Sequence, residues 1–263
     1  MKRYLIAATV LLLLALPAGA QGKVIELGAG AEPPAASNCP EDPCVAAYQV
    51  TAYQMRSGTL ENPFVIRRPG FVVAFTVKLG ELTPDQEAFF DDRFGSEPQV
   101  QLSILRKSTR KGHRRNHRLV RASEIFDVSP YLGSSPTFVL SKPLRVGKDF
   151  RVALSVPTWA PVLDTVDLAR TSWWRSSRQK GECGKDDELS PPSVQEELKS
   201  IVSYDCNYRN SRLLYTATYV PDPRETNVKK KQRRTRETRR SARASAARAE
   251  SPLLSLGGGA VFP

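Results

Sequence analysis

Residues 71–79 read Phe-Val-Val-Ala-Phe-Thr-Val-Lys-Leu, with apolar side chains recurring at every second position. The same period of two appears at Gln99–Ile104, Phe150–Val156 and Leu213–Val220. Alternation of this kind places one face of a strand in a core and the opposite face in water. Several such segments in one chain are typical of antiparallel sheets packed face to face. The sequence therefore predicts an all-β protein, an antiparallel β-sandwich.

Weaker alternation marks further strands, and two segments are typical of helices. The weaker strands are expected near residues 46–55, 119–128, 137–140 and 199–204. One short helix is expected over Pro84 to Phe94, because Thr83 can cap it, Gln86 completes a capping box and Gly95 follows its last turn. A second helical turn is expected at Val194 to Leu198.

The first twenty residues have the parts of a secretory signal peptide. Lys2 and Arg3 precede an apolar run from Tyr4 to Leu16, and Pro17–Ala20 offers a small-residue cleavage site. The run is too short to span a membrane. We therefore expect residues 1–20 to be a signal peptide and the mature chain to be secreted or associated with the cell envelope. That location excludes enzymes that depend on cytoplasmic ATP or nicotinamide, and no cofactor is expected.

The segments on either side of the sandwich are expected to have no structure of their own. Residues 21–38 are rich in Gly, Ala and Pro and predict a flexible linker. Residues 222–263 begin with Asp-Pro, contain few apolar side chains and are strongly basic. Such a segment buries too little surface to offset its ordering entropy, so it predicts a disordered basic C-terminal arm. A single sandwich domain is expected over residues 39–221.

The four cysteines are an even number in a chain that we expect to be exported. Cys39, Cys44, Cys183 and Cys206 therefore predict two disulfides, for which three pairings are open. The pairing of Cys39 with Cys44 and of Cys183 with Cys206 is favoured, since each bond closes a local loop. A zinc site is disfavoured by the spacing, and no metal is expected.

Positive charge is concentrated in two segments. Residues 106–121 hold eight Lys or Arg and no acid, and residues 224–250 hold eleven against three acids. Blocks of like charge are often interaction segments, although they also serve to keep exposed chain soluble. The basic segments lack interleaved aromatic side chains, so no specific nucleic acid is expected. The predicted polyanion-binding residues are Arg114, Arg115, Arg118, Lys229, Lys230, Lys231, Arg233 and Arg234.

The three tryptophans fall in one stretch of the chain. Trp159, Trp173 and Trp174, with Arg175 beside them, are candidates for a platform on which a sugar ring stacks. The competing interpretation, which is favoured, is that at least two of the rings fill the core. Adjacent residues of a strand point to opposite faces, so Trp173 and Trp174 cannot both be core residues if the segment is extended. One of these two is the best single candidate for a ligand platform.

The sequence gives little evidence for a set of catalytic residues. His113 and His117, the two histidines, both lie in the basic segment, where we expect a solvated hairpin loop without a carboxylate partner. Acid pairs suited to glycoside hydrolysis occur at Asp91–Asp92 and at Asp164 with Asp167, and the acidic run 186–188 could bind calcium weakly. Solvated turn and helix acids explain these residues more simply, and no catalytic residue is predicted.

Four segments resemble a set of exported bacterial β-sandwich proteins with no assigned activity. They are Cys39–Cys44, Pro136–Val146, Val152–Pro161 and Arg212–Ala217. The likeness covers about residues 39–221, omits the basic arm and implies no catalytic residues. The stretch 138–154 also resembles jelly-roll domains, which implies a jelly-roll-like sandwich and nothing about a ligand.

Together these features favour an exported, non-catalytic binding or envelope-associated module. Its expected partner is an anionic cell-surface polymer or a polysaccharide. Two alternatives stay open: an extracellular hydrolase that uses carboxylates, and a structural envelope protein without a small-molecule site. Accessible tryptophan rings would favour carbohydrate binding, whereas complete burial of all three would favour the structural protein.

Overall fold

The computed structural model describes residues 23–30, 36–165, 171–184, 189–223 and 234–242, so the predicted signal peptide lies outside the described residues. Helix α2 (Pro84–Phe94) and the short 3-10 helix η1 (Ser129–Tyr131) lie between strands. The strands are β1 (Ile25–Leu27), β2 (Ala47–Ser57), β3 (Leu60–Glu61), β4 (Gly70–Val77), β5 (Gln99–Lys107), β6 (Asn116–Asp127), β7 (Thr137–Val146), β8 (Phe150–Ala160), β9 (Leu163–Asp164), β10 (Trp173–Ser176), β11 (Ile201–Ser203), β12 (Cys206–Arg209), β13 (Arg212–Leu213) and β14 (Tyr215–Pro221).

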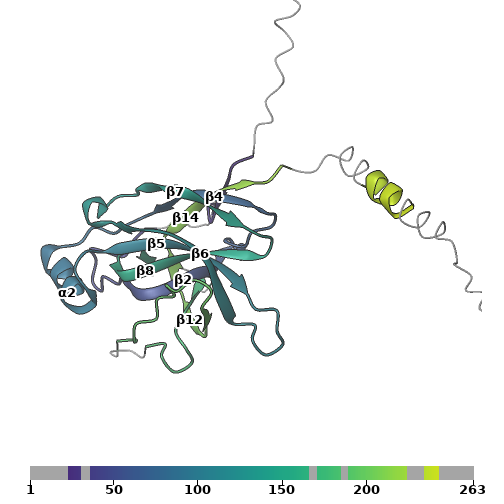
Figure 1. The fold of residues 1–263 in the computed structure, drawn as a ribbon. Coiled ribbons are helices and arrows are strands. Elements are labelled where there is room, and N and C mark those ends of the chain that lie inside the picture. Colours follow the sequence, from purple (N-terminus) through teal and green to yellow (C-terminus); the bar gives the residue numbers. More distant parts are fainter. Residues whose placement is uncertain (1–22, 31–35, 166–170, 185–188, 224–233, 243–263) are drawn as a thin grey trace, which may run out of the picture. The chain divides into compact units, whose positions relative to one another are not determined.

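Two sheets face each other, as Figure 1 shows, and they confirm the predicted all-β sandwich. The small sheet has the order β1-β14-β4-β7, and the large sheet runs β11-β6-β5-β8-β2-β10-β12, with β3 paired to β2. The named strands pair antiparallel, for example β5 with β6 and with β8. Their inward side chains form one apolar core that includes Val72, Phe75, Leu102, Ile104 and Leu154.

The strand order is that of a jelly roll. Eight core strands follow one another along the chain as β1, β2, β4, β5, β6, β7, β8 and β14. In the small sheet they lie in the order first, eighth, third and sixth, and in the large sheet fifth, fourth, seventh and second. The chain therefore crosses between the sheets at every step except the β5–β6 hairpin, the arrangement of paired Greek keys. Apart from β3, the remaining strands of the large sheet, β10, β11 and β12, come from the segment between β8 and β14.

Strand β4 departs from the predicted alternation at a β-bulge. The register with β7 shifts between Val72 and Ala74. Val72 is fully buried, whereas Phe71 is 38% exposed. Beyond the bulge Phe75 faces the core. The expected alternation would put Phe71 and Phe75 on one face, and this is wrong, because the bulge inserts one residue and reverses the faces on its two sides.

The predicted flexible linker over residues 21–38 is wrong at Ile25–Leu27, which forms β1. This strand pairs antiparallel with β14, with Ile25 opposite Tyr219. Ile25 and Leu27 pack against the main core, and the carboxylate of Glu26 accepts a 2.8 Å hydrogen bond from Thr218. Three residues are too short a segment for periodicity to be seen among glycines and alanines, yet they complete the small sheet.

Helix α2 is confirmed with the predicted cap. The Thr83 hydroxyl accepts from the Gln86 backbone N–H, and the Gln86 side chain accepts from the Thr83 backbone N–H. The helix buries Phe90 and Phe94 on one face, against Trp159 of β8. The second helical turn predicted at 194–198 is wrong, because that stretch shows no helix and ends in a turn around residues 197–199.

Both predicted disulfides are present, Cys39–Cys44 and Cys183–Cys206. The first closes the loop before β2, and the second joins Cys183 to the start of β12. Among the described residues no cysteine is free. The same part of the chain contains no helix long and apolar enough to cross a membrane.

The outer face of the large sheet is covered by chain rather than by water. The described residues 177–184 and 189–205, here called the strap, cross this face from β2 to β6. The backbone N–H of Ser177 donates to Thr51 in β2, and the N–H groups of Lys199 and Tyr204 donate to Leu119 and Arg115. We predicted that one face of each strand lies in water; for the central strands this is wrong, since the strap covers that face.

Small outward side chains of the sheet leave space for the strap to pack above them. Ser103, Ala153 and Ser155 point outward from β5 and β8 and are fully buried. The hydroxyl of Ser155 lies 2.7 Å from that of Thr51 and 2.8 Å from that of Ser103, so the polar groups under the strap satisfy one another. Larger outward residues at these positions would clash with the backbone of the strap.

The predicted disordered arm contains a helix. Residues 234–242 are helical, with the Thr238 hydroxyl donating to the Arg234 carbonyl at 2.8 Å. Arginine has a high helix propensity, and this stretch contains no glycine or proline. The remaining arm residues, 224–233 and 243–263, lie outside the described residues, as do the predicted polyanion contacts from Lys229 to Arg233.

Candidate anion-binding site

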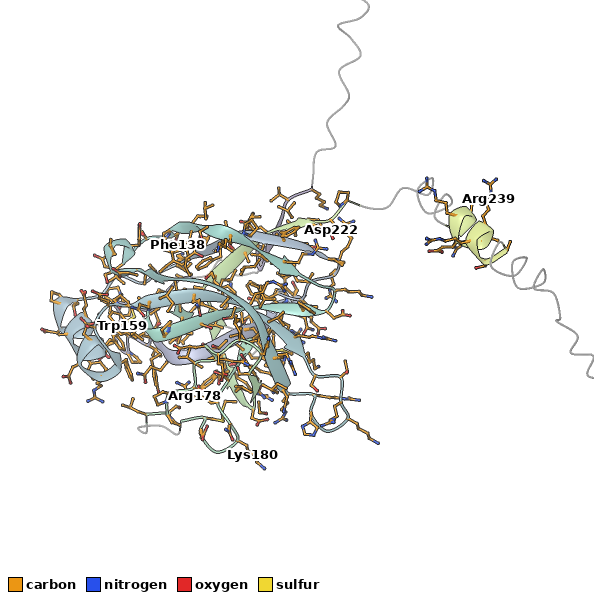
Figure 2. All side chains as sticks on the ribbon, in the orientation of Figure 1. Phe138, Trp159, Arg178, Lys180, Asp222 and Arg239 are labelled. Atoms are coloured by element: carbon orange, nitrogen blue, oxygen red, sulfur yellow. A yellow bond between two sulfur atoms is a disulfide. The ribbon has the colours of Figure 1, made fainter. Side chains whose placement is uncertain are left out.

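Two of the three tryptophans are structural. Trp159 is fully buried, stacks on Phe90 with ring centroids 5.1 Å apart, and donates its indole N–H to the Asp91 carboxylate at 3.0 Å. Its side chain lies beside α2 in Figure 2. Trp174 is 3% exposed, stacks on Tyr208 at 4.1 Å and donates to the Ser211 hydroxyl. Neither indole offers a free face on which a sugar could stack.

Trp173 differs from its neighbour, as the extended segment predicts. Strand β10 buries Trp174 and leaves Trp173 half-buried on the opposite face. Arg175 lies two residues along on the same face, with its guanidinium 5.6 Å from the centre of the Trp173 ring. Of the predicted platform, Trp173 and Arg175 are therefore the members that keep contact with solvent.

Arg175 connects the two sites that were predicted separately. Its guanidinium donates to the Tyr204 carbonyl at 3.0 Å. Burial lowers the pKa of Arg175, and the neighbouring charges of Arg115 and Arg151 lower it further, while Tyr53 and Asp205 oppose them. Arg115 belongs to the predicted polyanion loop, and its carbonyl accepts the backbone N–H of Tyr204, so Tyr204 links the tryptophan segment to the basic loop.

Arg151 is the cation of this region that lies deepest in the fold. It is 9% exposed and stacks on the Tyr53 ring at 4.8 Å. Its Nη1 donates to Asn62 Oδ1 at 3.2 Å and contacts the Met55 sulfur at 3.8 Å. Burial lowers the pKa of Arg151, and the charge of Arg67 lowers it further. Among the described residues no carboxylate forms an ion pair with it.

Lys107, at the end of β5, lies where these charges meet. Its pKa is lowered by partial burial and then by the positive charges of Arg151, Arg114 and Arg175. We call Lys107, Arg114, Arg115, Arg151 and Arg175 the Lys107 cluster. Within the described part of the chain, one carboxylate pairs with it, through the Arg115–Asp205 ion pair at 3.3 Å. Like charges held together in this way are relieved by a bound anion.

A groove opens beside the Lys107 cluster. Its volume is about 760 Å³, and the cations that line it are Arg67, Arg106, Lys107, Lys148 and Arg151. Among its described lining residues Asp149 is the one acid, and none is a tyrosine or tryptophan. We call this space the Arg151 groove. Its shape and charge suit an anionic group recognised by guanidinium forks and not by ring stacking.

The two histidines lie in different environments, so the prediction that both belong to a solvated loop is wrong for His117. His113 is exposed in the β5–β6 loop, whereas His117 lies in β6 under the strap and is 1% exposed. His117 Nδ1 lies 2.8 Å from the Arg115 carbonyl oxygen, and Nε2 lies 3.3 Å from the Tyr53 hydroxyl. Burial lowers the pKa of His117 to about 3, assisted by the charges of Arg151 and Lys107.

The candidate acid pairs do not converge on the site. Asp91 accepts from the Trp159 indole, and Asp164 is buried in β9 opposite Arg212. Asp167 and the run 186–188 lie outside the described residues. Within the described residues no three His, Cys, Asp or Glu side chains are grouped as metal ligands.

Sequence reasoning found part of the Lys107 cluster. Arg114, Arg115 and Arg175 were predicted as binding residues, and Arg118 lies nearby in β6, exposed to solvent. Lys107 and Arg151 were missed. Lys107 was visible as part of the basic segment, but Arg151 alternates with apolar residues in a strand and resembles an ordinary solvent-facing residue.

Comparison of the chain with protein-family models, curated proteins and solved structures finds no match in any of the three. The resemblance to exported bacterial proteins therefore stays a prediction.

Proposed function

We propose that this protein is an exported, non-catalytic module that attaches to a linear anionic polymer of the cell surface through the Lys107 cluster. The observation that carries the proposal is Arg151, a buried guanidinium without a carboxylate partner among the described residues, at the wall of a groove with four further cations. Burying a charge without a counter-ion costs free energy, and an anion bound in the groove would offset part of that cost.

Export is supported by two separate features. The first twenty residues have the form of a signal peptide. The two disulfides indicate an oxidising environment, such as that outside the cytoplasm. Surface polymers are the abundant polyanions in that environment, and the basic arm offers them a second, weaker attachment.

Carbohydrate recognition by stacked tryptophan has less support. Two of the three rings are buried, and the third, Trp173, lies under the guanidinium of Arg175. Trp173 extends the face that carries the Lys107 cluster, where an anionic sugar could meet both groups. Charge, and not ring area, therefore dominates the proposed recognition.

Retention on an immobilised polyanion in rising salt tests the proposal. The variant Lys107→Gln/Arg175→Gln removes two charges from the cluster. The control Lys142→Gln/Lys180→Gln removes two from exposed positions elsewhere, and Lys180 projects from its loop in Figure 2. We expect the cluster variant to elute at lower salt, with a log–log salt slope smaller by about 1.5, and the control to elute near the wild type.

Equal behaviour of the two double variants would overturn the proposal. Circular dichroism and thermal unfolding establish that each variant is folded before the comparison. A third protein lacking residues 224–263 measures the arm separately, with cell-wall material as the second matrix. If it is retained as strongly as the full chain, the arm has no part in attachment, whereas the role of the cluster still stands.

A further inference from the structure

A second basic groove shares part of its lining with the first. It has a volume of about 560 Å³, and its cations are Arg106, Lys107, Arg110 and Arg118. His113 also lines it, and the described lining residues include no acid. We call this space the Arg118 groove. It is bordered by the β5–β6 loop and by Ile201 of the strap.

The two grooves share one wall. Residues 106–109, the end of β5 and the start of the following loop, line both of them. This shared wall carries Arg106 and Lys107, so the positive charge is continuous from one groove to the other. Across the pair, Asp149 is the single acid among the described lining residues.

We infer that the two grooves form one track for a linear polymer that carries a phosphate or sulfate on each repeat, with residues 106–109 as the ridge that the polymer crosses. This inference rests on the proposed function and names its ligand class. A small anion fills one groove, whereas a longer chain fills both. Linking two binding events in one ligand raises affinity steeply once the chain spans both sites.

The track also excludes some ligands. Phe150, half-buried, is the one aromatic carbocycle among the described lining residues of the two grooves. Base stacking is therefore absent from the recognition that we propose, and a nucleic acid should bind through its phosphates alone. Arginine forks favour tetrahedral anionic groups spaced along a flexible backbone.

Calorimetric titration of the full chain with polyphosphates of increasing length tests the inference. The probes are tripolyphosphate and chains of about 15 and about 60 phosphates, and the expected gain in affinity from the shortest to the longest is about 100-fold. Part of any gain is statistical, because a longer chain offers more phosphate positions. Variants of each groove separate that part from true bridging.

The paired variants remove exposed cations from one groove each. Arg110→Gln/Arg118→Gln acts on the Arg118 groove, and Arg67→Gln/Lys148→Gln acts on the Arg151 groove. We expect each pair to remove most of the length-dependent gain while tripolyphosphate still binds at the intact groove. The charge-matched control Lys142→Gln/Lys180→Gln should keep the whole gain.

The possible outcomes separate the two proposals. If no polyphosphate binds at all, the proposed function fails. If all lengths bind but Arg110→Gln/Arg118→Gln keeps the full gain, the track is wrong and attachment through the Lys107 cluster still stands. Single-stranded DNA of matched charge is the last probe, and binding well above that of polyphosphate would contradict recognition through charge alone.

Discussion

Arg151→Met is the substitution that isolates the buried charge of the site. Methionine keeps an unbranched stem that can cover the Tyr53 ring, and it removes the guanidinium. The change also removes the 3.2 Å hydrogen bond to Asn62 and the cation–π contact at 4.8 Å. Asn62 is half-buried, so water can replace the lost donor.

The free energies that oppose each other are of similar size. A hydrogen bond from a charged donor contributes about 1.5–3 kcal/mol. A partly desolvated cation–π contact contributes about 1–2 kcal/mol. Against these losses, removing the guanidinium recovers the desolvation penalty of a single buried ion, which is on the order of several kcal/mol. We therefore expect the unfolding free energy of the unliganded variant to stay within about 1 kcal/mol of the wild type.

The response to an anion should differ much more. A ligand present at about 100 times its Kd stabilises the folded state by about 2.7 kcal/mol. For a domain of this size that corresponds to a rise in Tm of about 8 °C. Differential scanning calorimetry with and without long-chain polyphosphate should show this rise in the wild type and less than half of it in Arg151→Met.

Two results would be inconsistent with a role of Arg151 in anion binding. A loss of more than about 3 kcal/mol in the unliganded variant would show that Arg151 is held mainly by interactions within the fold. A full rise in Tm with polyphosphate would show that the anion binds without this guanidinium. Lys142→Gln, at an exposed position on β7, is the control and should keep the whole rise.

Two further predictions concern the strap. Replacing Cys183 and Cys206 by serine opens a loop with a sequence separation of 23 residues and should lower the unfolding free energy by about 3 kcal/mol; urea denaturation measures this, and an unchanged midpoint contradicts it. His117 has a folded pKa of about 3 against 6.5 for the free side chain, so the unfolded chain binds its proton first as the pH falls. This difference in pKa should lower the unfolding free energy of the wild type by about 4 kcal/mol between pH 6.5 and 3. In His117→Gln the decline should be shallower. Urea denaturation of both proteins at pH 7, 5 and 4 measures it. Equal slopes in the two proteins would show that the pKa of His117 does not differ between the folded and unfolded states.

Most elements of the jelly roll were predictable from local sequence patterns. Alternation located β5, β8 and β14, and a capping box located α2 to the residue, because both depend on short-range geometry. The disulfide pairing followed from loop closure. What periodicity missed was short or irregular, namely the three residues of β1 and the bulge in β4, whose positions are decided by pairing with distant strands.

The site was predictable only in part, because it depends on contacts between distant segments. Arg114 and Arg115 stood out as a charge block, whereas Arg151 resembled any polar residue of an alternating strand. Its partner on β5, Leu105, lies far away in sequence, and the pairing of β5 with β8 is what brings Lys107 toward it. The covered outer face was missed for the same reason, since the strap belongs to a polar loop without period.

Covering the outer face has a consequence for the location of the site. The strap covers the middle of that face, where Thr51, Ser103 and Ser155 of the sheet lie beneath it. The surface left open therefore lies at the end where β5 and β6 meet their loop. The cations of the Lys107 cluster gather at this end. The insertion between β8 and β14 therefore both seals the sheet and, through Arg175, contributes to the site.

Protection of Lys107 from acetylation shows whether a polyanion binds at the Lys107 cluster. Partial burial and the neighbouring positive charges lower its pKa, which raises the reactive amine fraction at a given pH. The protein is acetylated mildly with and without long-chain polyphosphate. Mass spectrometry then compares the extent of acetylation at Lys107 with that at Lys142 and Lys180 of the same chain. We expect strong protection of Lys107 and little at the other two. Equal labelling of Lys107 in the presence and absence of polyphosphate would contradict it.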